Sequence, residues 1–542
     1  MKRTSKISAI VPLVCGLAVG LVILLVGGLV IGRAAQQKEV VFTYVTNQET
    51  MSFDPADYSD MTTSANIFNT HDPLVYPVKG KAPEPCVAES WKISEDGTTY
   101  TFYIRKAIKF HDGTDLTAED VVFSMRRMLR LNLGFAWLWA GLFEPEDVEA
   151  TDEYTVVFHL KKPFAPFMAT LVQFHIVSKD LIMKEKKPGE FGKFGDYGRE
   201  YLQTHDAGSG PYMVESVTLG DRIHFVKFED YWKGWEENQI DEIHWLVIPE
   251  IATIKTMMLK GTADMCTEGL PPEMMEDLDK APGIKVVEKP SVKVFLTHMN
   301  NKKPPLDDVN VRKAISYAID YEAVNTTVFP GPQAVGPVPP GVPGHSRNVV
   351  VYSRDLEKAK QFLEKSKYSM EELKQMKLTF VYVSYVEMFR KLALLFNNSL
   401  ADIGLTVDIQ SEVWGRLCDM ATKPETTPHL ACMWVSAKYP TADYHTVMMY
   451  TPRGWKAYPG MSWYENPEVT ELVQQARLTV DPEERYRLYG KAQRIITEDS
   501  ATVWLTNPPL RRPMQTYVKG FRYPGVLSYD LDFYSLRIKK GR

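Results

Sequence analysis

The chain has 542 residues, more than one hydrophobic core usually serves, so we expect two or three domains. Hydrophobic residues make up 44% of it and charged residues 24%, as in ordinary globular proteins. The net charge of −5, with Lys and Arg scattered along the chain, excludes the basic surface by which proteins bind nucleic acid.

The first 38 residues predict a membrane-directed apolar helix that is not part of the fold. The run from Ile7 to Ile31 carries no charge and is long enough to span a bilayer, which needs about 20 apolar residues. A positive head precedes it, formed by Lys2, Arg3 and Lys6. This order places the body of the protein outside the cytoplasmic membrane, in the periplasm or on the outer face.

Three fates of this segment fit the sequence. An uncleaved anchor is favoured, because the apolar run is longer than the core of a cleaved signal. Cleavage after Ala34 is the second, since Gly32 and Ala34 are small. A lipoprotein modified at Cys15 is the third, but Val14 disfavours it, because lipidation needs a small residue just before the cysteine.

The exported body holds four cysteines, Cys86, Cys266, Cys418 and Cys432. Their spacing fits no zinc-binding pattern. An extracytoplasmic location permits disulfides, and residues 418 and 432 form the one close pair. Free buried thiols fit the sequence equally well.

Strand and helix signals alternate along the body, which favours an α/β fold. We expect strands over residues 39–45, 154–160 and 222–228, and a hairpin over residues 91–104 with its turn at Asp96-Gly97. Two amphipathic helices are expected near the end, over residues 466–478 and 482–497.

The most informative local pattern runs from Phe110 to Ser124. Asp112-Gly113 is a turn dipeptide, because glycine tolerates a positive φ. Thr117 can cap the helix that follows, and Asp120 completes a box of capping-box type. The buried stripe of that helix is then supplied by Val121, Val122 and Met125.

This string resembles the signature of the peptide/nickel-type extracellular solute-binding proteins of ABC importers (family 5, oligopeptide/dipeptide-binding-protein-like). Further stretches are similar to other patterns of that family: residues 74–76, 87–91, 94–102, 208–212, 261–264, 307–320, 466–469 and 481–489. They span about residues 40–540 in the family's order, which is more specific than any single motif. The chain is therefore identified as a member of this family.

The resemblance implies an α/β, two-lobed periplasmic-binding-protein fold of type II with an extra third domain, preceded by the N-terminal apolar helix. Carried over, the segment 1–38 is a signal or anchor, residues 39–81, 207–290 and 506–542 form lobe I, residues 82–206 form the extra domain, and residues 291–505 form lobe II. Ligand would bind between the lobes, which close on it by hinge motion.

The function implied is that of an extracytoplasmic solute-binding protein of an ABC transporter. It would capture an oligopeptide, an oligosaccharide or a similar organic solute and deliver it to the transmembrane permease subunits. The expected protein is a monomer held at the membrane by its N-terminal segment, with no cofactor and no metal. No nucleophile elbow, metalloprotease motif or phosphate-binding glycine loop appears, so nothing requires an enzyme. The alternative is a binding module that feeds a signalling partner.

The resemblance places the ligand site in the segment from Ala431 to Tyr444, a strand that runs into a loop. The residues there that match the family are Trp434, Tyr439 and Asp443. Peptide-binding members carry an Asp three residues after the Trp, and this Asp pairs with the free ammonium of the peptide. Here that position is Ala437, or Lys438 if one inserted residue is allowed.

Lys438 changes the chemistry expected of the site. A lysine would repel an ammonium by about 4 kcal/mol at about 4 Å with an effective dielectric near 20. It would suit a carboxylate, a phosphate or a carbohydrate hydroxyl instead. Ala431 also stands where some oligopeptide binders place an arginine, so peptides with free termini are in doubt. Alternatively, Lys438 points to solvent or pairs with Asp443.

Aromatic side chains cluster in loops around this segment. We expect cleft-lining rings, or rings packed in the core, at Trp137, Trp139, Trp414 and Trp455. Arg453 could add a charged hydrogen bond beside them. His111, in the signature turn, is interpreted as structural, since a lone histidine more often has that role.

Overall fold

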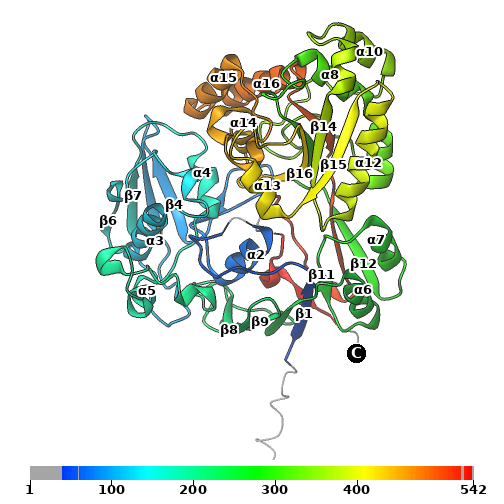
Figure 1. The fold of residues 1–542 in the computed structure, drawn as a ribbon. Helices are drawn as coiled ribbons and strands as arrows, with labels where there is room; N and C mark the ends of the chain where they lie inside the picture. The colour runs from blue at the N-terminus through cyan, green and yellow to red at the C-terminus, as the bar shows by residue number, and fades with distance from the viewer. Residues whose placement is uncertain (1–38, 59, 527–529, 540–542) are drawn as a thin grey trace, which may run out of the picture. The chain divides into compact units, whose positions relative to one another are not determined.

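A mixed sheet of seven strands gathers three distant parts of the chain, and the region around it is called lobe I below (Figure 1). The computed structural model describes residues 39–58, 60–526 and 530–539. In spatial order the strands are β12 (Ile284–Lys289), β18 (Leu510–Gln515), β11 (Met265–Cys266), β1 (Val41–Thr46), β10 (Glu242–Val247), β9 (Arg222–Lys227) and β8 (Tyr212–Thr218). β1 runs parallel to β10 and β11, and the other neighbours pair antiparallel.

Two helices cover one face of this sheet, α6 (Ile251–Lys260) and α7 (Pro272–Asp279). Their apolar sides meet β1 in a core that includes Val45, Ile254, Met258, Met275 and Leu278. The opposite face is aromatic, with the rings of Tyr44 and Trp245 4.4 Å apart. Helix α2 (Met61–Thr70) also belongs to lobe I, and Asp60 caps it by accepting from the Thr63 N–H.

A four-stranded antiparallel sheet forms the side domain, the part of the fold on the left of Figure 1. Its order is β4 (Ala88–Ile93), β5 (Thr99–Ile104), β7 (Thr155–His159) and β6 (Val148–Asp152). Helix α3 (Ala118–Leu131) packs on β6 and β7, and the short helices α4 (Phe167–Thr170) and α5 (Lys179–Glu185) follow. The capping box of Thr117 and Asp120 is present, and Gly113 has a φ of +86°, so both local predictions are confirmed.

A five-stranded sheet builds lobe II. Its order is β15 (Thr406–Glu412), β14 (Lys377–Val383), β16 (Leu430–Ser436), β13 (Lys293–Met299) and β17 (Thr502–Thr506). The helices around it are α8 (Val309–Ala318), α9 (Tyr321–Ala323), α10 (Leu356–Glu364), α11 (Met370–Gln375), α12 (Glu387–Ala401), α13 (Trp414–Met420), α14 (Ala442–Tyr450), α15 (Pro467–Leu478) and α16 (Pro482–Glu498). Two further sheets each consist of two short strands. They pair β2 (Val75–Tyr76) with β3 (Glu84–Pro85), and β19 (Val518–Lys519) with β20 (Arg537–Ile538).

The chain passes between lobe I and lobe II twice, through the short links that join β12 to β13 and β17 to β18. The links lie side by side. The Ser291 hydroxyl donates to the carbonyl of Pro508, and the Asn507 amide donates to the carbonyl of Lys293 over 3.0 Å. Two adjacent short connections are the arrangement that permits hinge motion between packed lobes.

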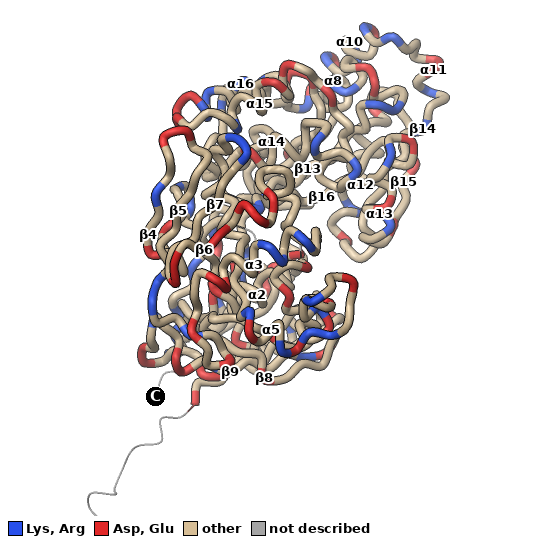
Figure 2. The backbone as a smooth tube through the Cα atoms, turned by 90° about the vertical axis from the view of Figure 1, so that its left-hand side faces the viewer, with Lys and Arg blue, Asp and Glu red and all other residues tan. Residues whose placement is uncertain are grey.

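The α/β prediction is confirmed, and so are the predicted strands, the hairpin turn at Asp96-Gly97 and the two terminal helices. The N-terminal anchor, signal and lipoprotein alternatives lie outside the described residues. Within the described ranges, no helix combines the length and apolar character needed to cross a bilayer. Cys86, Cys266, Cys418 and Cys432 are free thiols. Acidic and basic residues intersperse along the described chain (Figure 2).

Candidate functional site

A cavity of about 460 Å³ lies between lobe I and lobe II. Its walls combine apolar rings and methionines with charged groups, as ligand pockets do. Lobe I contributes Asp60, Met61, Glu268, Leu270 and Arg511 among others. The lobe II side includes Lys293, Phe329, Trp414, Trp434, Lys438 and Tyr458.

Strand β16 explains which part of the predicted segment faces the cavity. Side chains alternate across a strand, so every second residue points to the same face. Trp434 and Ser436 line the cavity, and Lys438 continues the series just past the end of the strand. The Trp434 ring is 36% exposed and rests on Phe389, with ring centroids 4.6 Å apart.

Trp414 opens helix α13 and forms a second aromatic wall. Its ring meets that of Tyr458 edge to face at a centroid distance of 5.0 Å. Trp414 is 38% exposed, so it presents a large apolar face to the cavity. Rings held in this way give contact area to an apolar or aliphatic ligand group.

Lys438 is the buried cation of the cavity wall, with 7% of its surface exposed. Its ammonium lies 5.7 Å from the centre of the Phe135 ring, and its carbonyl accepts from the Gln173 amide. Burial lowers the pKa of Lys438 to about 8, and the charge of Asp60 opposes this shift in part. The sequence alternative in which Lys438 points to solvent is therefore wrong.

Two carboxylates reach the cavity from lobe I, Asp60 and Glu268. Glu268 forms an ion pair with Lys293, the first residue of β13, so this pair joins lobe I to the start of lobe II. Burial by itself raises the pKa of Glu268, but the charges of Lys293 and Arg512 outweigh it and hold that pKa below its usual value. The cavity thus presents both signs of charge.

A second cavity, of about 490 Å³, lies between the side domain and lobe II. It is lined by Phe135, Trp137, Tyr444, Met448 and Arg453, and it shares Lys438 and Tyr458 with the first. Arg453 donates to the carbonyl of Trp137 over 3.4 Å, which ties the two walls together. Two predicted residues, Trp137 and Arg453, therefore line this second space.

The other predicted residues lie behind the cavity walls. Asp443 is fully buried and accepts hydrogen bonds from the hydroxyls of Tyr439 (2.7 Å) and Tyr489 (2.8 Å). Arg477 adds an ion pair to Asp443 at 3.2 Å. Ala437 is also fully buried and lines neither cavity. The expected ligand contacts of Ala437, Tyr439 and Asp443 therefore stay predictions.

Trp139 and Trp455 likewise line neither cavity. The indole of Trp139 is fully buried and donates to the Thr170 hydroxyl over 3.0 Å. Trp455 packs on Trp463 with ring centroids 5.4 Å apart. For both rings the observed contacts fit the packing alternative that the sequence left open.

His111 has a buried partner that its sequence neighbourhood does not show. Its Nδ1 bonds the carboxylate of Asp206, and its Nε2 lies 2.9 Å from the carbonyl oxygen of Gly210. Both acceptors need an N–H, so the ring carries both protons. These contacts connect the signature turn to the segment just before β8, as expected of a structural histidine.

Comparisons with known proteins agree with the fold. Residues 82–457 match the model of the bacterial extracellular solute-binding proteins, family 5. A probable D,D-dipeptide-binding periplasmic protein of Escherichia coli K12 is 31% identical over 452 residues, which cover 81% of this chain and 82% of that protein. The heme-binding protein A of Haemophilus influenzae is 27% identical over 93% of this chain and 94% of its own length.

A solved structure superimposes on most of the chain. The periplasmic binding protein DppA of Helicobacter pylori, in complex with the peptide STSA, has a TM-score of 0.78 and 27% identity. The match covers 94% of this chain and 100% of that one. The two-lobed periplasmic-binding-protein fold expected from the sequence is confirmed by this superposition.

Proposed function

The chain belongs to family 5 of the bacterial extracellular solute-binding proteins, and from this premise we propose that it captures a short peptide between lobe I and lobe II and delivers it to the permease of an ABC importer. The observation that carries the proposal is the mixed charge of the 460 Å³ cavity. A peptide with free termini carries both charges, and the cavity offers a partner for each.

Lys438 is proposed to hold the carboxylate of the peptide. A cation at a wall that is largely withdrawn from water favours an anionic group, because burial weakens competition from the solvent. Its pKa of about 8 leaves it mostly protonated at neutral pH. Trp434 and Trp414 would then flank the backbone or a side chain of the ligand.

Asp60 and Glu268 are proposed to receive the ammonium. The sequence placed free-terminus peptides in doubt because the family's acid is absent at Ala437. Both carboxylates reach the cavity from lobe I instead, so an acid is available from another part of the chain. The peptide named with the Helicobacter structure and the dipeptide named with the Escherichia coli relative support this ligand class.

The chain is an extracytoplasmic binding protein by family. We infer further that it acts without bond breaking, as a monomer, and that segment 1–38 holds it at the membrane. An oligosaccharide ligand and a signalling output have no support among the relatives named above, so they are not carried into the proposal.

The test is calorimetric titration and thermal unfolding of the full-length protein with free, N-acetylated and C-amidated forms of the same tri- and tetrapeptides. A ligand at about 100 times its dissociation constant should add about 2.7 kcal/mol to the free energy of unfolding. We expect the free peptides to bind and be recovered intact by mass spectrometry. Each capped form should bind at least tenfold more weakly.

Lys438→Met is the matched variant, and exposed Lys491→Met is its control. In Lys438→Met the free and C-amidated peptides should bind with similar affinity, because the partner of the carboxylate is gone. Equal binding of both forms to the wild-type protein would contradict the assigned role of Lys438. No binding of any free peptide would contradict the proposed ligand class.

A further inference from the structure

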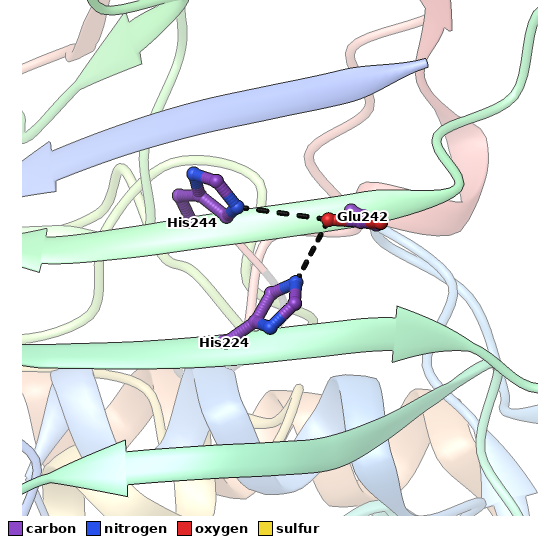
Figure 3. A group of neighbouring side chains, drawn as sticks. All are labelled: His224, Glu242 and His244. Atoms are coloured by element: carbon purple, nitrogen blue, oxygen red, sulfur yellow. Dashed lines mark hydrogen bonds and ion pairs between the residues drawn. The ribbon is translucent and has the colours of Figure 1, made fainter. Parts of the chain in front are cut away.

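Three metal-ligand side chains converge on one face of the lobe I sheet, away from both cavities (Figure 3). His224 projects from β9, and Glu242 and His244 project from β10. The Oε2 atom of Glu242 lies 2.9 Å from Nε2 of His224 and 3.7 Å from Nε2 of His244. All three donor atoms lie within 4.8 Å of one another.

Strand geometry brings these residues together. His224 and His244 are direct partners in the antiparallel ladder of β9 and β10. Glu242 precedes His244 by two residues, so it projects from the same face of the pleat. The paired strands therefore set the backbone positions from which the three donors project.

The cluster has no role in the core of the sheet. The alternate residues of the same strands, Phe225, Ile243 and Trp245, are buried on the opposite face. The three side chains keep 28% (His224), 27% (Glu242) and 45% (His244) of their surface exposed. Glutamate is disfavoured inside strands, so strand propensity gives no reason for this combination.

We propose that His224, Glu242 and His244 bind one divalent transition-metal ion of the zinc class. Two imidazole nitrogens, which are borderline donors, with one carboxylate oxygen form a ligand set that suits such an ion, whereas calcium and magnesium prefer oxygen donors throughout. Tetrahedral ligands at about 2.0–2.1 Å from zinc stand about 3.3 Å apart. The observed separations of 2.9 and 3.7 Å bracket this value.

The proposed metal would link β9 to β10 and leave a coordination position open to solvent. None of the three residues lines either described cavity, so the site does not depend on the peptide proposal. Its expected effect on the protein is stabilisation of lobe I, because an ion that binds the folded state alone stabilises that state.

The test is equilibrium dialysis and Co²⁺ absorption titration of the full-length, tag-free protein, with Zn²⁺ competition. We expect one Co²⁺ per chain, displaced by Zn²⁺, and a rise in melting temperature with Zn²⁺. His224→Ala, His244→Ala and Glu242→Gln should each weaken metal binding at least tenfold. All three positions are partly exposed, and circular dichroism will report whether each variant is folded.

His159→Ala is the matched control. His159 pairs with Glu149 across 3.2 Å on the side-domain sheet, but within the described residues this pair is not part of a three-donor group. Metal binding by this variant should equal that of the wild type. The proposal is overturned if the wild type takes up no Co²⁺, or if the folded Glu242→Gln and histidine variants bind it as tightly as the wild type.

Discussion

Two buried cations, His111 and Lys438, stand in opposite electrostatic settings. Burial by itself lowers the pKa of each. At His111 the carboxylate of Asp206 outweighs burial and the pKa is raised. At Lys438 burial prevails and the pKa falls to about 8. The comparison separates a buried charge that its ion-pair partner stabilises from a buried charge whose pKa is lowered by burial.

The largest expected effect is on the scaffold side of this comparison. His111→Ala leaves the carboxylate of Asp206 buried without its cation, so the free energy of unfolding should fall by about 3–5 kcal/mol. Urea denaturation of the unliganded wild type and variant measures this fall in the free energy of unfolding. His159→Ala, which removes an exposed histidine, should change stability by less than about 1 kcal/mol. A loss below about 1 kcal/mol for His111→Ala would show that the His111–Asp206 pair does not stabilise the fold.

Lys438→Met should change the free energy of unfolding in the opposite direction. Removing an ammonium held at a buried wall should raise the free energy of unfolding by about 1–3 kcal/mol at pH 7, while affinity for a free-terminus peptide falls at least tenfold. The folded pKa of about 8 lies below the ordinary value of 10.5, so the wild type regains this stability as pH rises from 8 to 10.5. If the free energies of unfolding of the wild type and Lys438→Met differed by a constant amount across that pH range, the lowered pKa of Lys438 would be contradicted.

Acid titration gives a smaller effect. His111 holds the pKa of Asp206 at about 2 against the raising effect of burial, compared with an ordinary value of 3.8. Asp206 therefore stabilises the fold above about pH 4, and about 2 kcal/mol of that is lost as the pH falls toward 2. The raised pKa of His111 extends the pair's contribution past pH 6.5, and it is lost at higher pH. Asp206→Asn should flatten the acid limb of the unfolding curve.

The smallest expected effect concerns Trp434. Trp434→Phe keeps a ring against Phe389 but shortens the face presented to the cavity, so peptide affinity should fall about threefold and stability by less than about 1 kcal/mol. Trp455→Phe, outside both cavities, should leave affinity unchanged. Calorimetric titration distinguishes them, and an equal loss in both variants would contradict the assignment of Trp434 to the ligand wall.

Local signals in the sequence were sufficient for the elements but not for the cavity. The Thr117–Asp120 capping box, the turn at Asp96-Gly97 and the helix beginning at Pro467 depend on neighbours within a few residues. The strand at Trp434 could be found by resemblance, and its period of two explains why Ser436 and Lys438 share the cavity while Ala437 does not.

Contacts between residues far apart in the sequence had no local sequence signal. Asp60 and Glu268 reach the cavity from positions 378 and 170 residues before Lys438. Asp206 meets His111 across 95 residues. Asp443, predicted as a ligand contact from its position in the motif, is contacted by Arg477 and Tyr489, which lie 34 and 46 residues further along the chain. Such contacts depend on tertiary packing, which residue order alone does not specify.

The place of β18 in the lobe I sheet sets an order of events for the newborn chain. β18 stands between β12 and β11, although about 220 residues separate it from β12 in sequence. Until residues 510–515 have been synthesised, the lobe I sheet lacks the strand between β12 and β11, and the facing edges of those two strands are unpaired. Unpaired strand edges invite association with other chains, so the polypeptide is exposed to misassembly until β18 is in place.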